Sequence, residues 1–431
     1  MTGALLLLAM LAPAQGALVS QDTVPVVTLA QAIERAARLD ANYVQALGNV
    51  SSAEWGRRAA RFAFVLPSVS VSTNLTRYST AFFNIGTGEL QNTSVTAQVD
   101  ARYELFSLRK LAELSRSSAA LEGASAQEQQ ARFAAAIVTE NDYYSVLASV
   151  ELARSAEDRV KRAEEGLSVA RARVTSGAAV RSDSLQLMLE LTRARVDLLR
   201  QRSALTVARL ELGRRVGAEG PVDAAPLDTV PAPPLPLELD RAVATALASG
   251  PQWRSARASE RAANAALRER TSDYFPTVNL SASHQRFDVK FFPSARNVSS
   301  ISLGVGWTLW NGGQREIAVA EARTGRNVAQ AVRADLERGA RADVTESYEA
   351  YNTARAATEL SASAVQVAQE NYRVQDSRYR AGAATILDLL DAQVGLTQAE
   401  ADLVQARYGT RLALAGLEAM LGQRLFTGTT E

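Results

Sequence analysis

Residues 289–313 read VKFFPSARNVSSISLGVGWTLWNGG, and this stretch decides the fold. From Ile301 to Leu309, apolar side chains alternate with serine, glycine and threonine. Strict alternation is typical of a β-strand with one apolar and one polar face. The chain on both sides is alanine-rich and charged, as in long helices. The fold therefore depends on what covers the apolar face of this strand.

The composition excludes several classes of function. The 47 basic and 46 acidic residues nearly cancel, so nothing in the charge predicts a nucleic-acid partner. The chain has no cysteine, which excludes disulfides, thiolate chemistry and a lipid anchor on cysteine. His284 is the only histidine, so no metal site, cofactor or catalytic triad is expected. We predict that the protein is not an enzyme.

The first residues, MTGALLLLAMLAPAQGA, contain an apolar run followed by small residues. This pattern predicts an export signal over residues 1–16, with an ordinary buried segment as the alternative. No Lys or Arg precedes the run, which leaves open a start codon upstream. Elsewhere no apolar run reaches the roughly 18 residues that a membrane helix needs.

Two halves of the chain resemble each other. LAQAIERAARLDANYVQA from Leu29 aligns with LDRAVATALASGPQWRSA from Leu239, and SGAAVRSDSL from Ser176 aligns with AGAATILDLL from Ala381. We predict two structural repeats, residues 17–218 and 238–424, followed by a tail, 425–431. Half of the twelve prolines fall between the repeats, so residues 219–237 are expected to form an extended linker.

The helical segments have matched lengths. Residues 108–175 and 315–380 predict uninterrupted rods of about 100 Å at 1.5 Å per residue. Residues 28–64 with 183–216, and 239–273 with 384–421, predict pairs of half-length helices that stack to the same height. Their small apolar residues favour narrow coiled-coil packing. A soluble coiled-coil rod would show the same helices.

Four segments predict strands, at about 66–79, 94–106, 276–288 and 299–310. A water-soluble sheet would alternate in the same way, but the export signal and the aromatic residues near the strand ends favour a membrane sheet. The pore-facing side would then carry serine, glycine and charged residues. The predicted lipid-facing residues are Val69, Val71, Leu303, Val305 and Trp307.

Four strands cannot close a barrel, and open strand edges cannot face lipid because their backbone groups would lack partners. Two chains would give eight strands and a filled bore, whereas three would give twelve and a channel. We therefore expect a mainly α protein that assembles as a homotrimer. Twelve rods would form an α-barrel, topped by a twelve-strand membrane β-barrel with four strands per chain.

The duplicated halves, the paired strands, LWNGG at residues 309–313 and RYRAGAATILDLLDAQ at residues 378–393 resemble the outer-membrane efflux protein family of TolC-like channels. The resemblance spans nearly the whole mature chain. It implies an outer-membrane trimer with a helical tunnel in the periplasm, and as partners a periplasmic adaptor and an inner-membrane pump. It implies the outer-membrane channel of a tripartite efflux or type I secretion system.

The resemblance also implies a gate where the tunnel narrows. Its carboxylates would be Asp388 and Asp391 and its tyrosine Tyr379, whereas Ala384 stands where the best-known members have a latch arginine. Asp388 and Asp391 share one helix face, so a trimer would concentrate negative charge on its axis. Two solvated acids, or a first-turn role for Asp388, are the alternatives.

Gly177 and Gly382 are expected to end the long helices in the left-handed conformation. Small residues surround both, and such smooth tips suit insertion into an adaptor. The expected docking residues are Ser176, Gly177, Ala178, Ala381, Gly382 and Ala383. The competing interpretation is a secreted or periplasmic coiled-coil structural or adaptor protein. The sequence does not identify the cargo.

Overall fold

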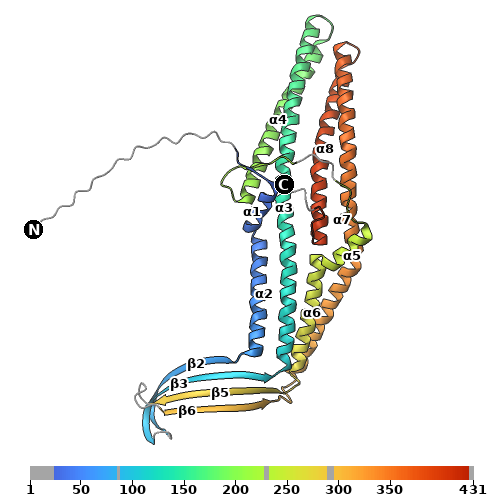
Figure 1. Ribbon diagram of the computed structural model, residues 1–431. Helices are drawn as coiled ribbons and strands as arrows, with labels where there is room; N and C mark the ends of the chain where they lie inside the picture. The colour runs from blue at the N-terminus through green and yellow to red at the C-terminus, as the bar shows by residue number, and fades with distance from the viewer. Residues whose placement is uncertain (1–23, 85–87, 228–232, 289–295, 427–431) are drawn as a thin grey trace, which may run out of the picture.

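The computed structural model describes residues 24–84, 88–227, 233–288 and 296–426. The predicted export signal, Phe291, Phe292 and the last five residues of the predicted tail lie outside the described residues. Two long helices, α3 (Leu108–Thr175) and α7 (Gln314–Arg380), run the length of an elongated molecule, from the strands at one end to the turns at the other (Figure 1). Both agree with the predicted rods.

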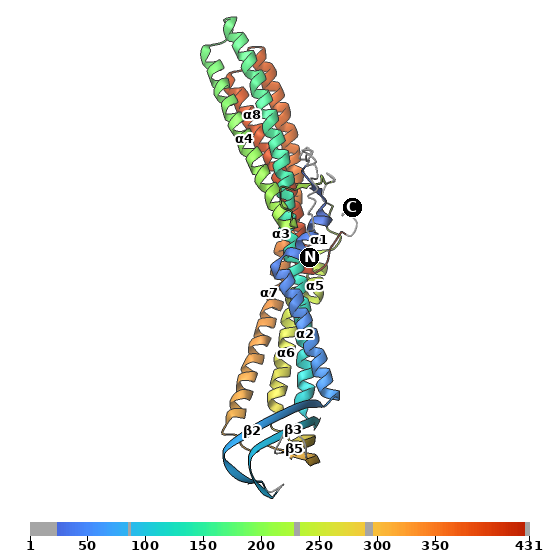
Figure 2. The same ribbon diagram turned by 90° about the vertical axis from the view of Figure 1, so that its left-hand side faces the viewer.

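Shorter helices complete the rods. Beside the half of α3 and α7 that lies near the turns run α4 (Arg181–Val216) and α8 (Ile386–Leu421). Beside the half near the strands run α2 (Ala41–Val65) and α6 (Pro251–Ser272). The short helices α1 (Leu29–Leu39) and α5 (Leu239–Ser249) lie at the waist between the two halves (Figures 1 and 2).

The predicted continuous helices over 28–64 and 239–273 are wrong, because each is broken near its start. Asp40 ends α1 in an extended conformation, and its carboxylate accepts a bond from the Tyr43 N–H at 2.9 Å, which starts α2. Gly250 precedes Pro251, whose ring disfavours helical geometry at the residue before it. A proline is well placed as the first residue of α6. The two repeats break at matching points by different chemistry.

The strands β2 (Ser68–Asn84), β3 (Glu89–Phe106), β5 (Thr277–Asp288) and β6 (Arg296–Gly306) form an antiparallel sheet in that order. The predicted strands are present with shifted ends. The first pair extends farther at its outer end than predicted. β6 ends at Gly306, so Trp307 and Trp310 follow the strand rather than belong to it.

The register places the predicted apolar residues on one face. Val69 lies opposite Ala101, which lies opposite Ala282, and Ala282 lies opposite Ile301. The neighbouring rows hold Leu280 with Leu303 and Val278 with Val305. The rows between them carry serine, asparagine and glycine on the other face. The sheet is therefore two-faced across all four strands.

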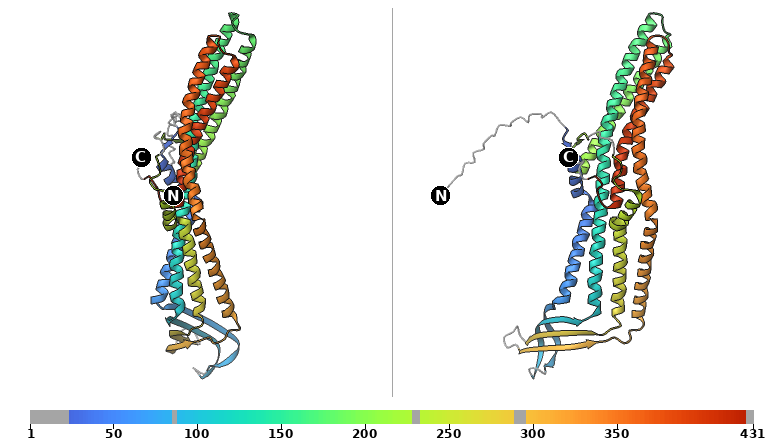
Figure 3. Two further views of the ribbon diagram at one scale, coloured as in Figure 1. Left: turned by 90° about the vertical axis from the view of Figure 1, so that its right-hand side faces the viewer. Right: turned by 45° about the vertical axis from the view of Figure 1, so that its right-hand side comes forward.

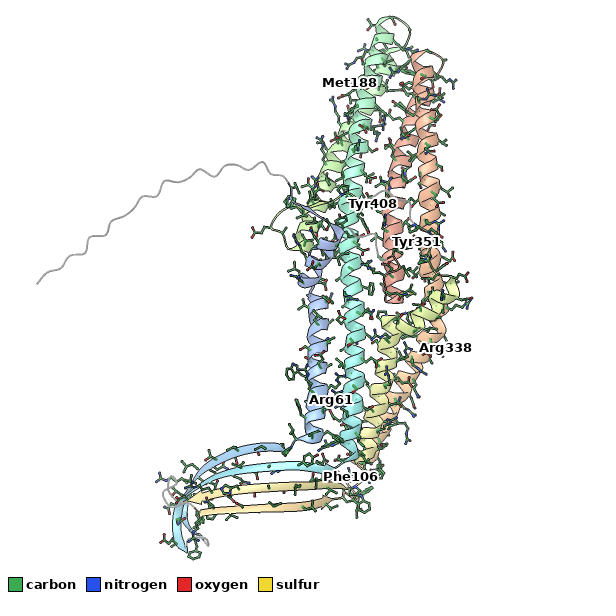
Figure 4. All side chains as sticks on the ribbon, in the orientation of Figure 1. Arg61, Phe106, Met188, Arg338, Tyr351 and Tyr408 are labelled. Carbon is green, nitrogen blue, oxygen red and sulfur yellow. The ribbon has the colours of Figure 1, made fainter. Side chains whose placement is uncertain are left out.

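The segment between the repeats is built into the waist rather than left as a free spacer. β1 (Val26–Val27) pairs in parallel with β4 (Asp223–Ala224), and Val222 is buried beside them. Tyr143 donates to the Ala225 carbonyl at 2.7 Å, and Tyr351 donates to the Pro233 carbonyl at 2.6 Å. Tyr351 and Tyr408 mark this level in Figure 4. Tyrosine hydroxyls thus satisfy carbonyls of a proline-rich segment that has few N–H groups.

Three layers share one order. Near the turns the helices pack as α4, α3, α8, α7, and near the strands as α2, α3, α6, α7, while the sheet runs β2, β3, β5, β6 (Figures 1 and 3). In each layer an element of the first repeat forms one edge and an element of the second repeat forms the other. Within the described residues, every layer is open at both edges.

Candidate functional site

The two helix turns at the end away from the strands have the same backbone. Gly177 and Gly382 have φ of 78° and 80°, which L side chains rarely adopt. The Ala178 N–H donates to the Arg173 carbonyl, and the Ala383 N–H donates to the Arg378 carbonyl, both at 2.8 Å. These bonds close the last turn of α3 and of α7. The prediction that both glycines end their helices in the left-handed conformation is confirmed.

The arginines at equivalent positions near the two turns have different hydrogen-bond partners. Arg173 and Arg378 each donate to the carbonyl of the alanine after the glycine, Ala178 or Ala383, at 3.3 Å. Arg173 also donates to the Tyr379 carbonyl on α7 and lies 4.7 Å from the centre of the Tyr379 ring. The other bond of Arg378 stays on α7, to Gln375. Arg173 alone of the two therefore ties the α3–α4 hairpin to the α7–α8 hairpin.

Tyr379 is buried between the two hairpins, with 1% of its surface exposed. It packs with Leu187 of α4 and with Ile386 and Leu389 of α8. Burial, followed by the negative charge of Asp183, raises the pKa of the Tyr379 phenol, and the phenol oxygen has no hydrogen-bond partner among the described residues. The Tyr379 ring therefore packs between the two hairpins and does not face open space.

Asp388 starts α8. Its carboxylate accepts bonds from the Thr385 N–H at 2.9 Å and the Thr385 hydroxyl at 2.7 Å, while the Asp388 N–H donates to that hydroxyl at 3.3 Å. This reciprocal arrangement is a capping box. The bonds from Thr385 lower the pKa of Asp388. The carboxylate therefore stays ionised at neutral pH and has a structural role in the first turn.

Asp391 lies one turn farther along α8 and is exposed. Within the described chain it makes no side-chain hydrogen bond or ion pair. Leu389 and Ala392 of the same helix are buried, so Asp388 and Asp391 lie on the side of α8 that faces away from the packed hairpins. Of the two acids, Asp391 is the one whose carboxylate has no partner within the described chain.

The edge helix α4 carries two apolar stripes. Leu187, Leu191 and Ala194 are buried inside the hairpin pair. A second stripe of large apolar residues is exposed and occupies five positions of a coiled-coil heptad pattern, whose remaining positions hold Thr192, Ser203 and Thr206. It comprises Leu185, Leu189, Val196, Leu199 and Leu210. Met188 lies next to this seam near the turn (Figure 4).

The opposite edge helix, α7, has a matching stripe. Leu360, Val367 and Val374 recur every seven residues and are exposed, Leu360 to 72%. A seven-residue apolar repeat is the mark of a helix that packs on another helix. α8 packs against α7 on a different side, so this stripe has no partner within the described chain. Both stripes are too long to be isolated surface residues.

The strand end of the molecule exposes its apolar face. Val69, Val71, Leu303 and Val305 are 63% to 75% exposed. Trp307 is 61% exposed, and its indole N–H donates to the Tyr274 carbonyl at 3.1 Å. An exposed apolar face of this size marks an interaction surface or a membrane surface.

The junction between β6 and α7 is held by Arg315. Its guanidinium lies 3.9 Å from the centre of the Tyr274 ring and donates to the Thr308 carbonyl at 3.0 Å. Gly312 and Gly313 both have positive φ there, which explains the glycine pair of LWNGG. Among the described helices, none has an apolar stretch long enough to cross a membrane. No cluster of metal-ligating side chains is found within the same residues.

Sequence reasoning found the turn glycines and the two acids but missed two features. The exposed seam on α4 is legible in the sequence as a second heptad pattern, offset from the first. The tie made by Arg173 is not, because its counterpart Arg378 has the same local sequence, R-x-x-x-G-A-A. Only the packing of one hairpin against the other distinguishes the two arginines.

Comparison with known proteins gives a family match over most of the chain. A sequence model described as outer membrane efflux protein matches residues 29–218 and 242–423. Protein CyaE of Bordetella pertussis is 29% identical over 206 residues. That match covers 46% of this chain and 44% of CyaE, so the chain matches less than half the length of this relative.

Solved structures share the fold. The outer membrane protein VceC of Vibrio cholerae superposes with a TM-score of 0.74 at 18% identity, covering 92% of this chain and 97% of VceC. The CmeC outer membrane channel of Campylobacter jejuni superposes with a TM-score of 0.77 at 13% identity, covering 93% of this chain and 87% of CmeC. At these identities the likeness concerns the fold.

Proposed function

The chain belongs to the outer membrane efflux protein family, and from this premise we propose that it works as a homotrimeric conduit of a tripartite efflux or type I secretion system. Membership of the family makes it a protein of the outer membrane with a helical tunnel in the periplasm. The family match favours this role over a coiled-coil structural or adaptor protein. The cargo and the class of the pump remain outside the proposal.

One observation supports assembly into a ring. Each of the three layers is open at both edges, with the first repeat at one edge and the second repeat at the other. In a ring of copies, α7 and β6 of one copy meet α4, α2 and β2 of the next. Such head-to-tail contacts form a ring when the rotation between copies closes. The exposed seams on α4 and α7 would bury each other, and the strand edges would gain backbone partners. Three copies give twelve strands and leave a channel.

The exposed face of the sheet supports the membrane placement. In the closed ring, Val69, Val71, Leu303 and Val305 would face lipid, with Trp307 at the boundary between lipid and water. The other face carries Ser302, Gly304 and their hydroxyl-rich neighbours toward the pore. An interior of this kind suits a passive water-filled conduit.

We place the gate at the helix tips. Arg173 and Tyr379 would hold the α7–α8 hairpin against its neighbour in the closed state. Asp388 and Asp391 would add two carboxylates per chain around the axis, which favours cations. Because Ala384 leaves no latch arginine after the glycine, Arg173 is proposed to supply this function from the other hairpin.

The tips are also the proposed docking site of the periplasmic adaptor. Ala178 and Ala383 are small residues at the outermost turns, where bulky side chains would prevent close approach. Ser176, Gly177, Ala381 and Gly382 complete this surface. Replacement of Ala178 or Ala383 by tryptophan should abolish efflux while the trimer stays folded. Wild-type drug tolerance in cells that carry either variant would argue against docking there.

The experiment that tests the proposed function is fractionation followed by electrophoresis without boiling. The protein should sediment with the outer membrane and migrate as a trimer that heat converts to a monomer. In planar bilayers the purified trimer should form water-filled channels. A detergent-independent monomer in the soluble fraction would contradict both the channel and the trimer, and would favour the structural alternative.

A further inference from the structure

A groove runs along α3 and α6 just beyond the strands. Its lower part has an apolar floor of Leu108, Leu111 and Phe275. Its upper part is polar and lies between Ser118 and Asn264. Ser115 and Arg268 line both parts, so the two are continuous. Leu111 and Phe275 are 54% and 53% exposed, which is unusual for large apolar residues above a packed helix pair.

The groove opens on the side of the sheet's apolar face. Arg109 of α3 lies on the side of the polar face, because its guanidinium is 3.7 Å from the carboxylate of Glu104, which shares a row with Asn279 and Gly304. Residues two positions apart on a helix point to nearly opposite sides. Leu111, which lines the groove, stands two positions after Arg109. The groove is therefore the upward continuation of the apolar surface that begins at the row of Phe106 and Val278.

Arg268 is the basic residue of this groove whose charge is not neutralised by an acidic partner within the described chain. Arg261 lies farther up α6, seven residues before Arg268. It donates to Glu122 at 2.6 Å, and the charge of Glu122 neutralises it. Among the described residues, the Arg268 guanidinium makes no ion pair and no side-chain hydrogen bond, and it is exposed. The groove lining therefore has one net positive charge, at the border between its apolar and polar parts.

The position of Arg268 near the end of α6 brings its long side chain within reach of a lipid headgroup. Arg268 stands four residues before the end of α6 at Ser272, which is about 6 Å at 1.5 Å per residue. Phe106 and Trp307 mark the boundary of the apolar face at the strand-to-rod junction; Figure 4 labels Phe106 there. The polar headgroup layer of a bilayer extends about 5 to 8 Å beyond its hydrocarbon core.

We propose that the groove between α3 and α6 binds an anionic phospholipid of the periplasmic leaflet. Arg268 binds the phosphate, Ser115 contacts the headgroup, and the glycerol and first methylenes lie on Leu111 and Phe275. This inference rests on the proposed placement of the sheet in the outer membrane. It adds a specific lipid site to a surface that would otherwise contact lipid without selectivity.

The test is native mass spectrometry of the purified trimer, titrated with phosphatidylglycerol or phosphatidylcholine. Phosphatidylglycerol should bind saturably and more tightly than phosphatidylcholine. Arg268→Glu should weaken its binding about tenfold or more, because a charge-assisted bond is replaced by repulsion. Arg270→Glu makes the same charge change on another face of α6 and should leave the affinity unchanged. Phe275→Ala should weaken both lipids.

Equal binding of the two lipids, or equal effects of Arg268→Glu and Arg270→Glu, would overturn the lipid site. So would displacement of the lipid by inorganic phosphate alone, since the site would then recognise free phosphate. Arg268→Glu should keep wild-type conductance in planar bilayers. A wild-type protein that forms no channel would instead contradict the proposed function, which separates the two failures.

Discussion

The two repeats agree in their helices and differ in their strands. α3 and α7 have 68 and 67 residues, α4 and α8 have 36 each, and α1 and α5 have 11 each. In contrast, β2 and β3 have 17 and 18 residues, whereas β5 and β6 have 12 and 11. In the proposed ring the rods must have one height, whereas the strands need only cross the membrane and their outer ends are free to differ.

The two helix turns also agree in backbone conformation and differ in their side-chain contacts. The backbones of the two turns superimpose in their hydrogen bonds, yet Arg173 contacts the other hairpin and Arg378 does not. α8 starts with a capping box, while Val180 starts α4 without a side-chain cap. Duplication therefore preserved the geometry of the turn, and the two copies diverged in what the turn holds.

The largest expected effect separates the two arginines. Arg173→Ala removes a charge-assisted bond between the hairpins and should favour the open state about tenfold or more. Arg378→Ala removes only bonds within its own hairpin and should leave the closed state intact. Conductance in planar bilayers measures both. Equal conductance of the two variants would remove the tie from the gate.

The two glycines should behave alike. Gly177→Ala and Gly382→Ala place a side chain at a φ of about 80°, and each should destabilise its turn by about 1 to 2 kcal/mol. A Cβ at Gly177 meets no atom within 4 Å, and at Gly382 it meets only the Arg173 guanidinium at 3.5 Å. The midpoint temperature of thermal unfolding should therefore fall by a similar amount in both variants. A loss at one turn alone would break the equivalence.

The helix starts should respond in opposite directions. Thr385→Val removes the cap of α8 and should cost about 1 kcal/mol, whereas Val180→Ser supplies a cap to α4 and should stabilise it by about 0.5 to 1 kcal/mol. Chemical denaturation of each variant measures the change. A destabilising Val180→Ser would show that the start of α4 is constrained by something other than its missing cap.

The two acids of α8 should differ in how their replacement affects the pH dependence of stability. Asp388 has a lowered pKa in the folded protein, so its cap is fully present above the unfolded value of about 3.9 and is lost as pH falls through the folded value. Asp391→Asn should reduce cation selectivity. Asp388→Asn should reduce cation selectivity and also lower stability at neutral pH, and its stability should approach that of the wild type as pH falls through the folded pKa of Asp388. Reversal potentials and acid unfolding measure the pair, and unchanged selectivity in the double variant would place both acids outside the pore.

Much of the fold was predictable because it is periodic. α3 ends at the predicted residues, since no proline interrupts it and Gly177 follows it. The alternation around Leu303 fixed the face of β6. The sequence prediction misses the break at Gly250 because it continues one helix through Pro251. Proline is favourable as the first residue of a new helix. The break at Asp40 depends on one side chain that serves as a cap.

The site was less predictable because it depends on neighbours. Asp388 and Asp391 look equivalent in sequence, but Thr385 makes one of them a cap. The resemblance implies that Tyr379 helps to close the tunnel mouth, but the sequence does not show that Leu187 and Leu389 bury its ring. A sequence shows which residues share a helix face. It does not show which face another hairpin covers.

The most direct test of the ring uses the absence of native cysteine. Leu199 stands about 27 Å from the start of α4, and Leu360 stands about 30 Å from the end of α7, so the two lie at one height. In outer membranes, Leu199→Cys with Leu360→Cys should cross-link into covalent trimers, while each single variant stays monomeric under denaturing conditions. A double variant that yields no inter-chain cross-link would contradict closure of the ring through these edges.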